Sequence, residues 1–442
     1  MTGTIMGDDA RQALGNACQL AGSADEYAQE LLTISKPDWH QLLILGNGFD
    51  LECGLRSSFA DFEVNRECEL ELQNVVLHEN IGQWLDYLIK ENITIWDIIL
   101  LQKKESLWSD IEAAIRDSVL DVSKHSIGEL VDWRISSKWE KQIRSNLSFV
   151  QKWAMALLDL RETARKEFGK ENIEGIDELI LLYLVKILDN NNVEAVDERK
   201  LSRVMLDQLH ILEDEFANYL NQQISNKYYS NSLRLISEIL IYGQPSKDKY
   251  RIHSSLINFN YTDPLKNMKN KYEIFSDSIT NIHGSLADGK IIFGIDGMGC
   301  MSDENTMPFT KTYRLMQCNR AIKTDLFYGP VKGDKQRVTK VIKFYGHSLS
   351  PADYSYFQSI FDDVDLYAGD TKLIFFYRPP KNDGGQKGDP EKARSDMVRK
   401  VVRLINSYGS TLDNVDHGEN MLHKLLLEGR LNIIELPRYI AI

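Results

Sequence analysis

The chain has 442 residues, of which 43% are hydrophobic and 26% charged, and its formal net charge at pH 7 is -13. The length predicts more than one packed unit, and the composition is that of a globular protein rather than a disordered one. An acidic balance of this size argues against a surface devoted to nucleic acid, because such surfaces need clustered Lys and Arg. We therefore do not expect nucleic acid as a partner.

The beginning of the chain does not indicate a secreted protein, and the cysteines do not indicate a metal site. The first segment, 1–36, is treated as an N-terminal extension and lacks the basic start and continuous apolar stretch of a secretory signal. No later run approaches membrane-spanning length. The five cysteines contain no C-x-x-C pair, so neither a disulfide framework nor a zinc ribbon is indicated. The sequence predicts a cytoplasmic protein without a membrane partner.

The first predicted strand is the apolar run QLLILG at 41–46, which leads into the glycine turn GNGFD. A glycine turn between a buried strand and a helix leaves backbone N–H groups free to cradle phosphates. We expect Gly46 and Gly48 to permit this close approach, and Asn47 or Asp50 to bind a ribose hydroxyl. The alternative is a turn that is tight for structural reasons alone.

A long helical region follows. Between 81 and 250, apolar residues recur three and four positions apart, as in RKLSRVMLDQLHILEDEFANYLNQQI, which is the spacing of amphipathic helices. Proline is absent from 38 to 244, which favours uninterrupted helices. We predict a helical domain at 81–250, inserted into an α/β domain formed by 37–80 and 251–442.

From 255 onward, short apolar runs such as KVIKFYG and KLIFFYRP alternate with helical stretches such as ARSDMVRKVVRLINSYG. This alternation indicates an α/β, Rossmann-like fold, with a mostly parallel sheet covered by helices. The strand at 41–46 is expected to join the same sheet. Ligands of such sheets gather at the carboxyl ends of the strands.

Two polar residues follow predicted strands in this half of the chain. Asn260 in NFNYTDP can hold a ribose hydroxyl or position a water, because its amide both donates and accepts. His283 in IHG can titrate near neutral pH and take a proton. For each residue the alternative is a structural role, Asn260 by shaping the turn before Pro264 and His283 as an ordinary strand-end histidine.

The last motif, FYGHSLSPADYSYF at 344–357, runs from a strand through a Gly-His-Ser turn into a helix. Such a turn can close over an adenosine, with Gly346 allowing the approach and Ser348 reaching a ribose or phosphate oxygen. His347 has two interpretations, ligand contact or packing, which the sequence does not separate. Asp353 is interpreted as favouring the helix dipole.

Taken in order, LGNGFDLECGL, SSFADF, FNYTDPL, IHG and YGHSLSPADYSYF resemble the motif set of the bacteriophage abortive infection AbiH family, whose members are associated with defence against bacteriophage. The resemblance covers 41–62 and 256–361, and WSDIE at 108–112 resembles a further element of the family. It implies a role in abortive infection.

The same order of motifs is similar to the sirtuin-like NAD-binding fold, some of whose bacterial defence members hydrolyse NAD. This similarity implies that Asn260 orients water and the nicotinamide ribose and that His283 is the base. It further implies that the dinucleotide is held by the residues of the two glycine-containing turns: Gly46, Gly48, Gly346 and Ser348. The zinc-binding cysteines of sirtuins are absent, so protein deacylation is not expected.

These observations predict an abortive-infection effector that cleaves the N-glycosidic bond of NAD, its substrate, to nicotinamide and ADP-ribose without a metal. Two alternatives from other classes stay open. The first is a module that shares the glycine motifs but binds a nucleotide intact and regulates a partner. The second is a metal-dependent nuclease using Asp50 and Asp61, for which the sequence shows no compact ligand cluster. The sequence leaves open whether a phage-derived activator is needed and whether the chain forms a homo-oligomer.

Overall fold

The computed structural model describes residues 37–69, 81–103, 112, 115–116, 198–266, 275, 278–297, 301–317, 339–379 and 388–437. The predicted N-terminal extension lies outside them. At the centre is a six-stranded sheet in which every neighbouring pair of strands is parallel. Its strands in chain order are β1 (Asp38–Leu45), β2 (Arg251–Asn258), β3 (Ser278–Asn281), β6 (Thr339–Tyr345), β7 (Lys372–Tyr377) and β8 (Leu431–Glu435).

The order of the strands across the sheet is β3-β2-β1-β6-β7-β8. The chain therefore builds outward from β1 through β2 to β3, returns to place β6 against the other side of β1, and continues outward through β7. In an open parallel sheet, such a reversal leaves a crevice beyond the strand ends where dinucleotides bind. The predicted α/β, Rossmann-like architecture is confirmed.

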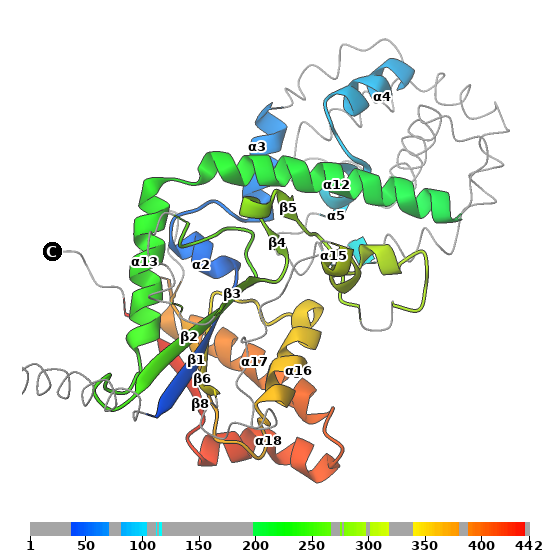
Figure 1. Cartoon of the computed structure of the whole chain (residues 1–442). Helices are drawn as coiled ribbons and strands as arrows, with labels where there is room; N and C mark the ends of the chain where they lie inside the picture. The colour runs from blue at the N-terminus through cyan, green and yellow to red at the C-terminus, as the bar shows by residue number, and fades with distance from the viewer. Residues whose placement is uncertain are drawn as a thin grey trace, which may run out of the picture.

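Helices cover both faces of the sheet, which explains why its strands are apolar throughout. In β1, Leu42 and Ile44 pack into one apolar cluster and Leu43 and Leu45 into another, as side chains alternate along a strand. The first cluster is closed by α16 (Tyr354–Asp363), α17 (Pro390–Gly409) and α18 (Val415–Leu427). The second is closed mainly by α2 (Asn47–Glu52), α3 (Phe59–Glu69), α12 (Glu198–Gln223) and α13 (Asn226–Ile241). Figure 1 shows the two groups on opposite sides of the strands.

Within 81–250, the described elements are α4 (Ile81–Lys90), α5 (Ile95–Lys103), α12 and α13, all of them helices. One of these, α13, packs directly on the sheet. The buried Lys343 of β6 donates from Nζ to the carbonyl oxygens of Ile239 at 3.0 Å and Leu240 at 2.7 Å, at the end of that helix. The division into an α/β domain and an inserted helical domain stays a prediction.

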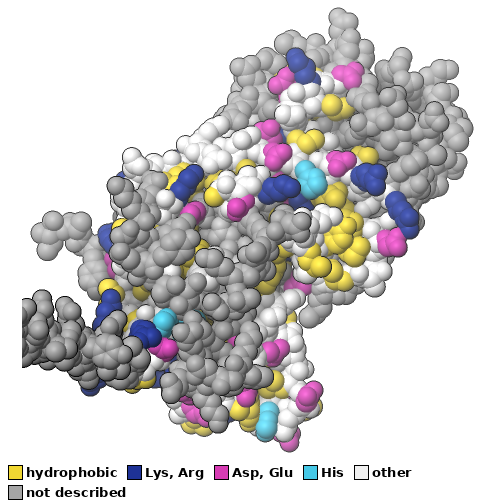
Figure 2. Space-filling view, viewed as in Figure 1, with side chains coloured by type: hydrophobic (Ala, Val, Ile, Leu, Met, Phe, Trp, Pro, Cys, Tyr) yellow, Lys and Arg dark blue, Asp and Glu magenta, His cyan; other side chains and the backbone are white. Residues whose placement is uncertain are grey.

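The surface carries mixed charge on the face that Figure 2 shows, where the Lys and Arg side chains of the described residues are interspersed with Asp and Glu. None of the described helices is long and apolar enough to span a bilayer.

Candidate active site

The carboxyl ends of four neighbouring strands bring the sequence motifs to one edge of the sheet. Gly46 follows β1, Asn260 stands two residues after the end of β2, His283 follows β3, and Gly346 follows β6. Because the four strands are parallel and adjacent, motifs that are up to 300 residues apart in the chain meet here. The edge coincides with the reversal of strand order between β1 and β6.

The glycine motifs after β1 and β6 cross each other in direct backbone contact. Gly46 N–H donates to Tyr345 O at 3.0 Å, and Gly48 N–H donates to Gly346 O at 2.8 Å. A Cβ on Gly46 would stand 2.5 Å from His347 Cα, and one on Gly48 would stand 2.8 Å from Gly346 Cα. The sequence assigned these glycines and N–H groups to a phosphate. In the structure they let two backbones pass, and these two N–H donors have protein acceptors; the phosphate role of the turn stays a prediction.

The other two polar residues of the first motif are also engaged within the protein. Residues 47–50 form the first turn of α2 rather than a loop. Asp50 is 1% exposed and accepts hydrogen bonds from Tyr228 Oη at 2.7 Å and Thr262 Oγ1 at 2.9 Å. Burial raises the pKa of Asp50 to about 7, against the lowering effect of these two hydroxyls. The half-buried Asn47 accepts from Ser57 Oγ at 2.5 Å.

Asn260 joins the ends of two strands. Its Nδ2 donates to Gly46 O at 3.1 Å, and its backbone N–H donates to Asn258 Oδ1 at 3.1 Å. The side chain is therefore held in one orientation at the edge of the sheet, almost fully buried. In this orientation its Oδ1 can accept a hydrogen bond.

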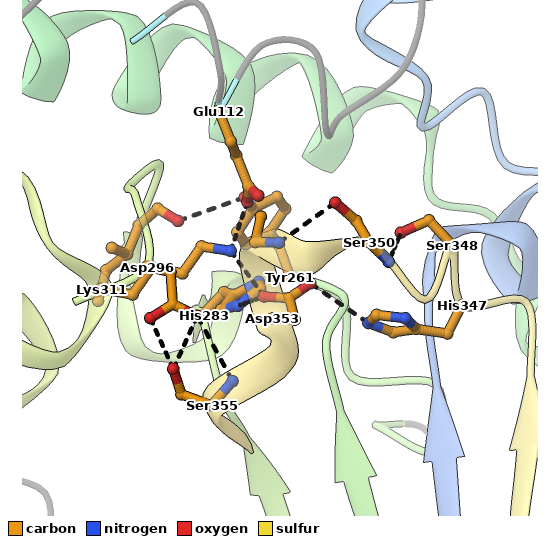
Figure 3. A network of polar contacts seen from close by, with 12 residues as sticks. Glu112, Tyr261, His283, Asp296, Lys311, His347, Ser348, Ser350, Asp353 and Ser355 are labelled. Atoms are coloured by element: carbon orange, nitrogen blue, oxygen red, sulfur yellow. Dashed lines mark hydrogen bonds and ion pairs between the residues drawn. The ribbon is translucent and has the colours of Figure 1, made fainter. Parts of the chain in front are cut away.

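Asp353 lies between two histidines (Figure 3). His347 Nε2 is 3.4 Å from Asp353 Oδ2, and His347 Nδ1 accepts from Leu349 N–H at 2.9 Å, so the proton of a neutral ring sits on Nε2. His283 Nε2 is 3.1 Å from Asp353 Oδ1. This contact does not form a hydrogen bond, and the nitrogen has no hydrogen-bond partner among the described residues. Asp353 thus faces both imidazole rings at once.

Lys311 supplies the positive charge of the cluster. Its Nζ lies 2.7 Å from Asp353 Oδ1 and 2.5 Å from Glu112 Oε1, and the residue is 1% exposed. The ammonium group therefore occupies the space between two carboxylates. In the part of the chain that the structure describes, no group of three or more His, Cys, Asp and Glu side chains is arranged to hold a metal ion.

The charges of the cluster follow from this geometry. Burial would raise the pKa of Asp353, but Lys311 and His283 hold it well below its usual range, so the carboxylate is ionised. Burial, and secondly Lys311, lower the pKa of His283 to about 4, so its ring is neutral at pH 7. Burial raises the pKa of Glu112 above its usual value despite Lys311. The site combines a fixed anion with a neutral histidine.

The structure gives Asp353 partners that the sequence did not predict. Asp353 is the N-cap residue of α16, but its side chain makes no capping hydrogen bond. Its carboxylate turns instead toward Lys311 and the histidines, because these provide charged and polar partners in a buried space. Ser348 is exposed beside this cluster, and its Oγ accepts weakly from Ser350 N–H at 3.4 Å.

Two residues of the cluster carried little or no signal in the sequence. Glu112 is the last residue of WSDIE, which the family resemblance included, but no chemistry was assigned to it. Lys311 belongs to no motif, and only its position in the fold brings it to Asp353. A lysine that is buried on a short helix has no distinguishing local pattern.

Comparison with known proteins matches the chain to a protein family. A family model described as "Bacteriophage abortive infection AbiH" matches residues 42–377, which is more than half of the chain and includes every site residue described above. No curated protein and no solved structure matches the chain.

Proposed function

Because the chain belongs to the bacteriophage abortive infection AbiH family, its role lies in abortive infection, and we propose that it acts there by hydrolysing NAD to nicotinamide and ADP-ribose. The observation that carries the proposal is the ionised Asp353 carboxylate between the rings of His283 and His347, beside the crevice position of a Rossmann-like sheet. The similarity of the motif order to the sirtuin-like NAD-binding fold supports NAD as the proposed substrate.

The reaction breaks the bond between nicotinamide and C1′ of its ribose. Nicotinamide leaves with the bonding electron pair as a neutral molecule, and C1′ acquires cationic character. A water oxygen then bonds to C1′ and releases a proton. An ionised carboxylate in a site shielded from water stabilises such a cation, which is the contribution we assign to Asp353.

His283 is the proposed acceptor of the proton. Its Nε2 faces Asp353, which leaves Nδ1 for the water. With a pKa near 4, the ring is unprotonated at neutral pH and free to accept. A ring with this pKa is a weak base, which suits a reaction in which the leaving group departs before the water loses its proton. Asp353 would stabilise the imidazolium that forms.

Asn260 is the proposed water-positioning residue. Its Nδ2 is fixed on Gly46 O, so its Oδ1 can accept from a water or a ribose hydroxyl in one orientation. Ser348 is exposed at the adjoining strand end, where its hydroxyl can reach a ribose or phosphate oxygen. Asn260, Ser348 and His283 follow the ends of β2, β6 and β3, so a dinucleotide would lie across the strand ends.

The test is to incubate the purified full chain with NAD, with and without a chelator and with and without extract from phage-infected cells, and to identify the products by mass. The proposal expects nicotinamide and ADP-ribose in molar excess over protein, with no loss of activity in the chelator. NAD that is bound one-to-one and recovered intact would favour the nucleotide-sensing module. Cleavage of nucleic acid that stops in the chelator would favour the nuclease.

A further inference from the structure

A short helix, α15 (Lys311–Gln317), connects the candidate active site with α12. Lys311 and Arg314 are three positions apart on this helix and are both buried. Lys311 reaches Asp353, as described above. Arg314 reaches Glu213 of α12, with 2.6 Å between Nη2 and Oε2, and its Nη1 donates to Phe293 O at 2.8 Å.

Glu213 also holds the segment between the two-residue strand β5 (Lys290–Ile291) and α15. Its Oε1 accepts from Phe293 N–H at 2.6 Å. The neighbouring Ile292 N–H donates to His283 O at 2.9 Å, and Ile295 O accepts from Lys311 N–H at 3.0 Å. One carboxylate therefore fixes both the segment that borders His283 and the helix that carries Lys311.

The side chain of Glu213 is 4% exposed and that of Arg314 is 8% exposed. A buried, planar guanidinium that binds both oxygens of a carboxylate fixes orientation as well as distance. If the pair is broken, α15 loses this attachment to α12, and Lys311 can move away from its place beside Asp353 and His283 although it keeps its charge. The position of Lys311, rather than its charge, is what the pair controls.

We infer that Glu213 is a positioning residue for the candidate active site, acting from α12 through Arg314 and Phe293 to place Lys311 and the backbone beside His283. Through Glu213 and Arg314, α12 is mechanically coupled to the site. A partner or activator that shifts this helix would therefore change the surroundings of His283. It rests on the proposed function only where NAD cleavage is the quantity measured.

The first test reads the ring of His283 directly and needs no NAD. Histidine ring resonances of the full chain are followed by NMR across pH, with His283 assigned by comparison with His283→Ala. The titratable side chains around this ring come from several elements: Asp353, Lys311, His347, Tyr261 and Tyr356. Lys311 lowers the pKa of His283, so displacing Lys311 in Glu213→Gln is expected to raise that pKa from about 4 toward the ordinary histidine value.

Arg199→Leu is the matched control, because it removes an exposed ion pair between the same helix and Glu304, in the loop before α15. It should leave the titration of His283 unchanged. Arg314→Lys is the second variant in case Glu213→Gln does not fold, since it keeps the charge but loses the two-pronged contact, and it should shift the titration in the same direction. A lower Tm with an unchanged His283 titration in a folded Glu213 or Arg314 variant would overturn the inference.

Kinetics provide the second readout if the chain cleaves NAD. Glu213→Gln should lower kcat about tenfold and change KM by less than about threefold, because Glu213 does not touch substrate. A titration shift in a chain that does not cleave NAD would refute the proposed function and leave the positioning role standing. Normal kcat in a folded Glu213→Gln protein would refute the positioning role alone.

Discussion

Two buried carboxylates at the same edge of the sheet, Asp50 and Asp353, show how neighbours decide what a buried acid can do. Asp50 faces the hydroxyls of Tyr228 and Thr262, and burial raises its pKa to about 7. Asp353 is also buried, but Lys311 keeps its pKa well below the usual range. Hydroxyls satisfy hydrogen bonds without compensating charge, whereas an ammonium group compensates it. The first carboxyl therefore supports the scaffold, and the second supplies a lasting negative charge.

The largest expected effect on stability separates the same two residues. Asp353→Asn leaves the buried ammonium of Lys311 without its main counter-charge, and breaking such a pair costs about 3–5 kcal/mol of unfolding free energy. Asp50→Asn keeps a group that can accept from both hydroxyls and should cost less than about 1 kcal/mol at pH 7. Urea unfolding of both variants measures the difference. Equal losses would mean that Lys311 does not depend on Asp353.

The next comparison concerns two residues at the proposed water site. His283→Ala and Asn260→Ala should each lower NAD turnover on the order of a hundredfold while nucleotide affinity falls little. Because both residues act on one step, the double variant should be only slightly slower than either single variant. His347→Ala is the control and should alter binding more than turnover. Losses that multiply in the double variant would assign the two residues to separate steps.

The backbone crossing is tested by two glycines with similar φ angles. Gly346 has φ +73°, and an added Cβ would stand 2.2 Å from Phe49 N; Gly289 has φ +65° and no heavy atom within 4 Å of the same point. Gly289→Ala should lower the unfolding free energy by about 1 kcal/mol, because only the positive φ angle disfavours a side chain there. Gly346→Ala should cost about 1–3 kcal/mol more, because the backbones must separate. Equal urea unfolding midpoints for Gly346→Ala and Gly289→Ala would show that the two backbones are not in tight contact at Gly346.

The last comparison concerns pH dependence. Asp50 binds its proton more tightly in the folded chain, so its contribution to the unfolding free energy falls as pH rises from about 4 to about 7. Asn at this position does not titrate, so wild type should lose stability relative to Asp50→Asn across that window. Asp353 has the opposite sign: its contribution is present above the ordinary carboxyl pKa and is lost at lower pH. Unfolding at several pH values checks the slope, and a constant difference between wild type and Asp50→Asn would contradict it.

The sequence predicted that the motifs meet at one edge of the sheet, but it predicted few of the contacts that their residues make there. The apolar runs and the turns after them predicted parallel strands with Asn260 and His283 at one edge, because strand polarity and burial are local properties. The close contact of Gly48 with the Gly346 backbone was not predicted, because it depends on the pairing of β1 with β6, and the phosphate role of Gly48 stays a prediction. Lys311 was missed for the same reason: its partners come from distant segments, and no local pattern marks a buried lysine.

The proposed role of His283 in NAD cleavage is tested by nicotinamide release from folded His283→Ala and Asp50→Asn, measured side by side at pH 7. We expect release on the order of a hundredfold slower in His283→Ala and close to wild type in Asp50→Asn, with nucleotide affinity kept in both. This outcome would place the chemistry at the cluster around Asp353 rather than at the glycine motif. Full NAD cleavage by folded His283→Ala, together with a loss in Asp50→Asn, would contradict it.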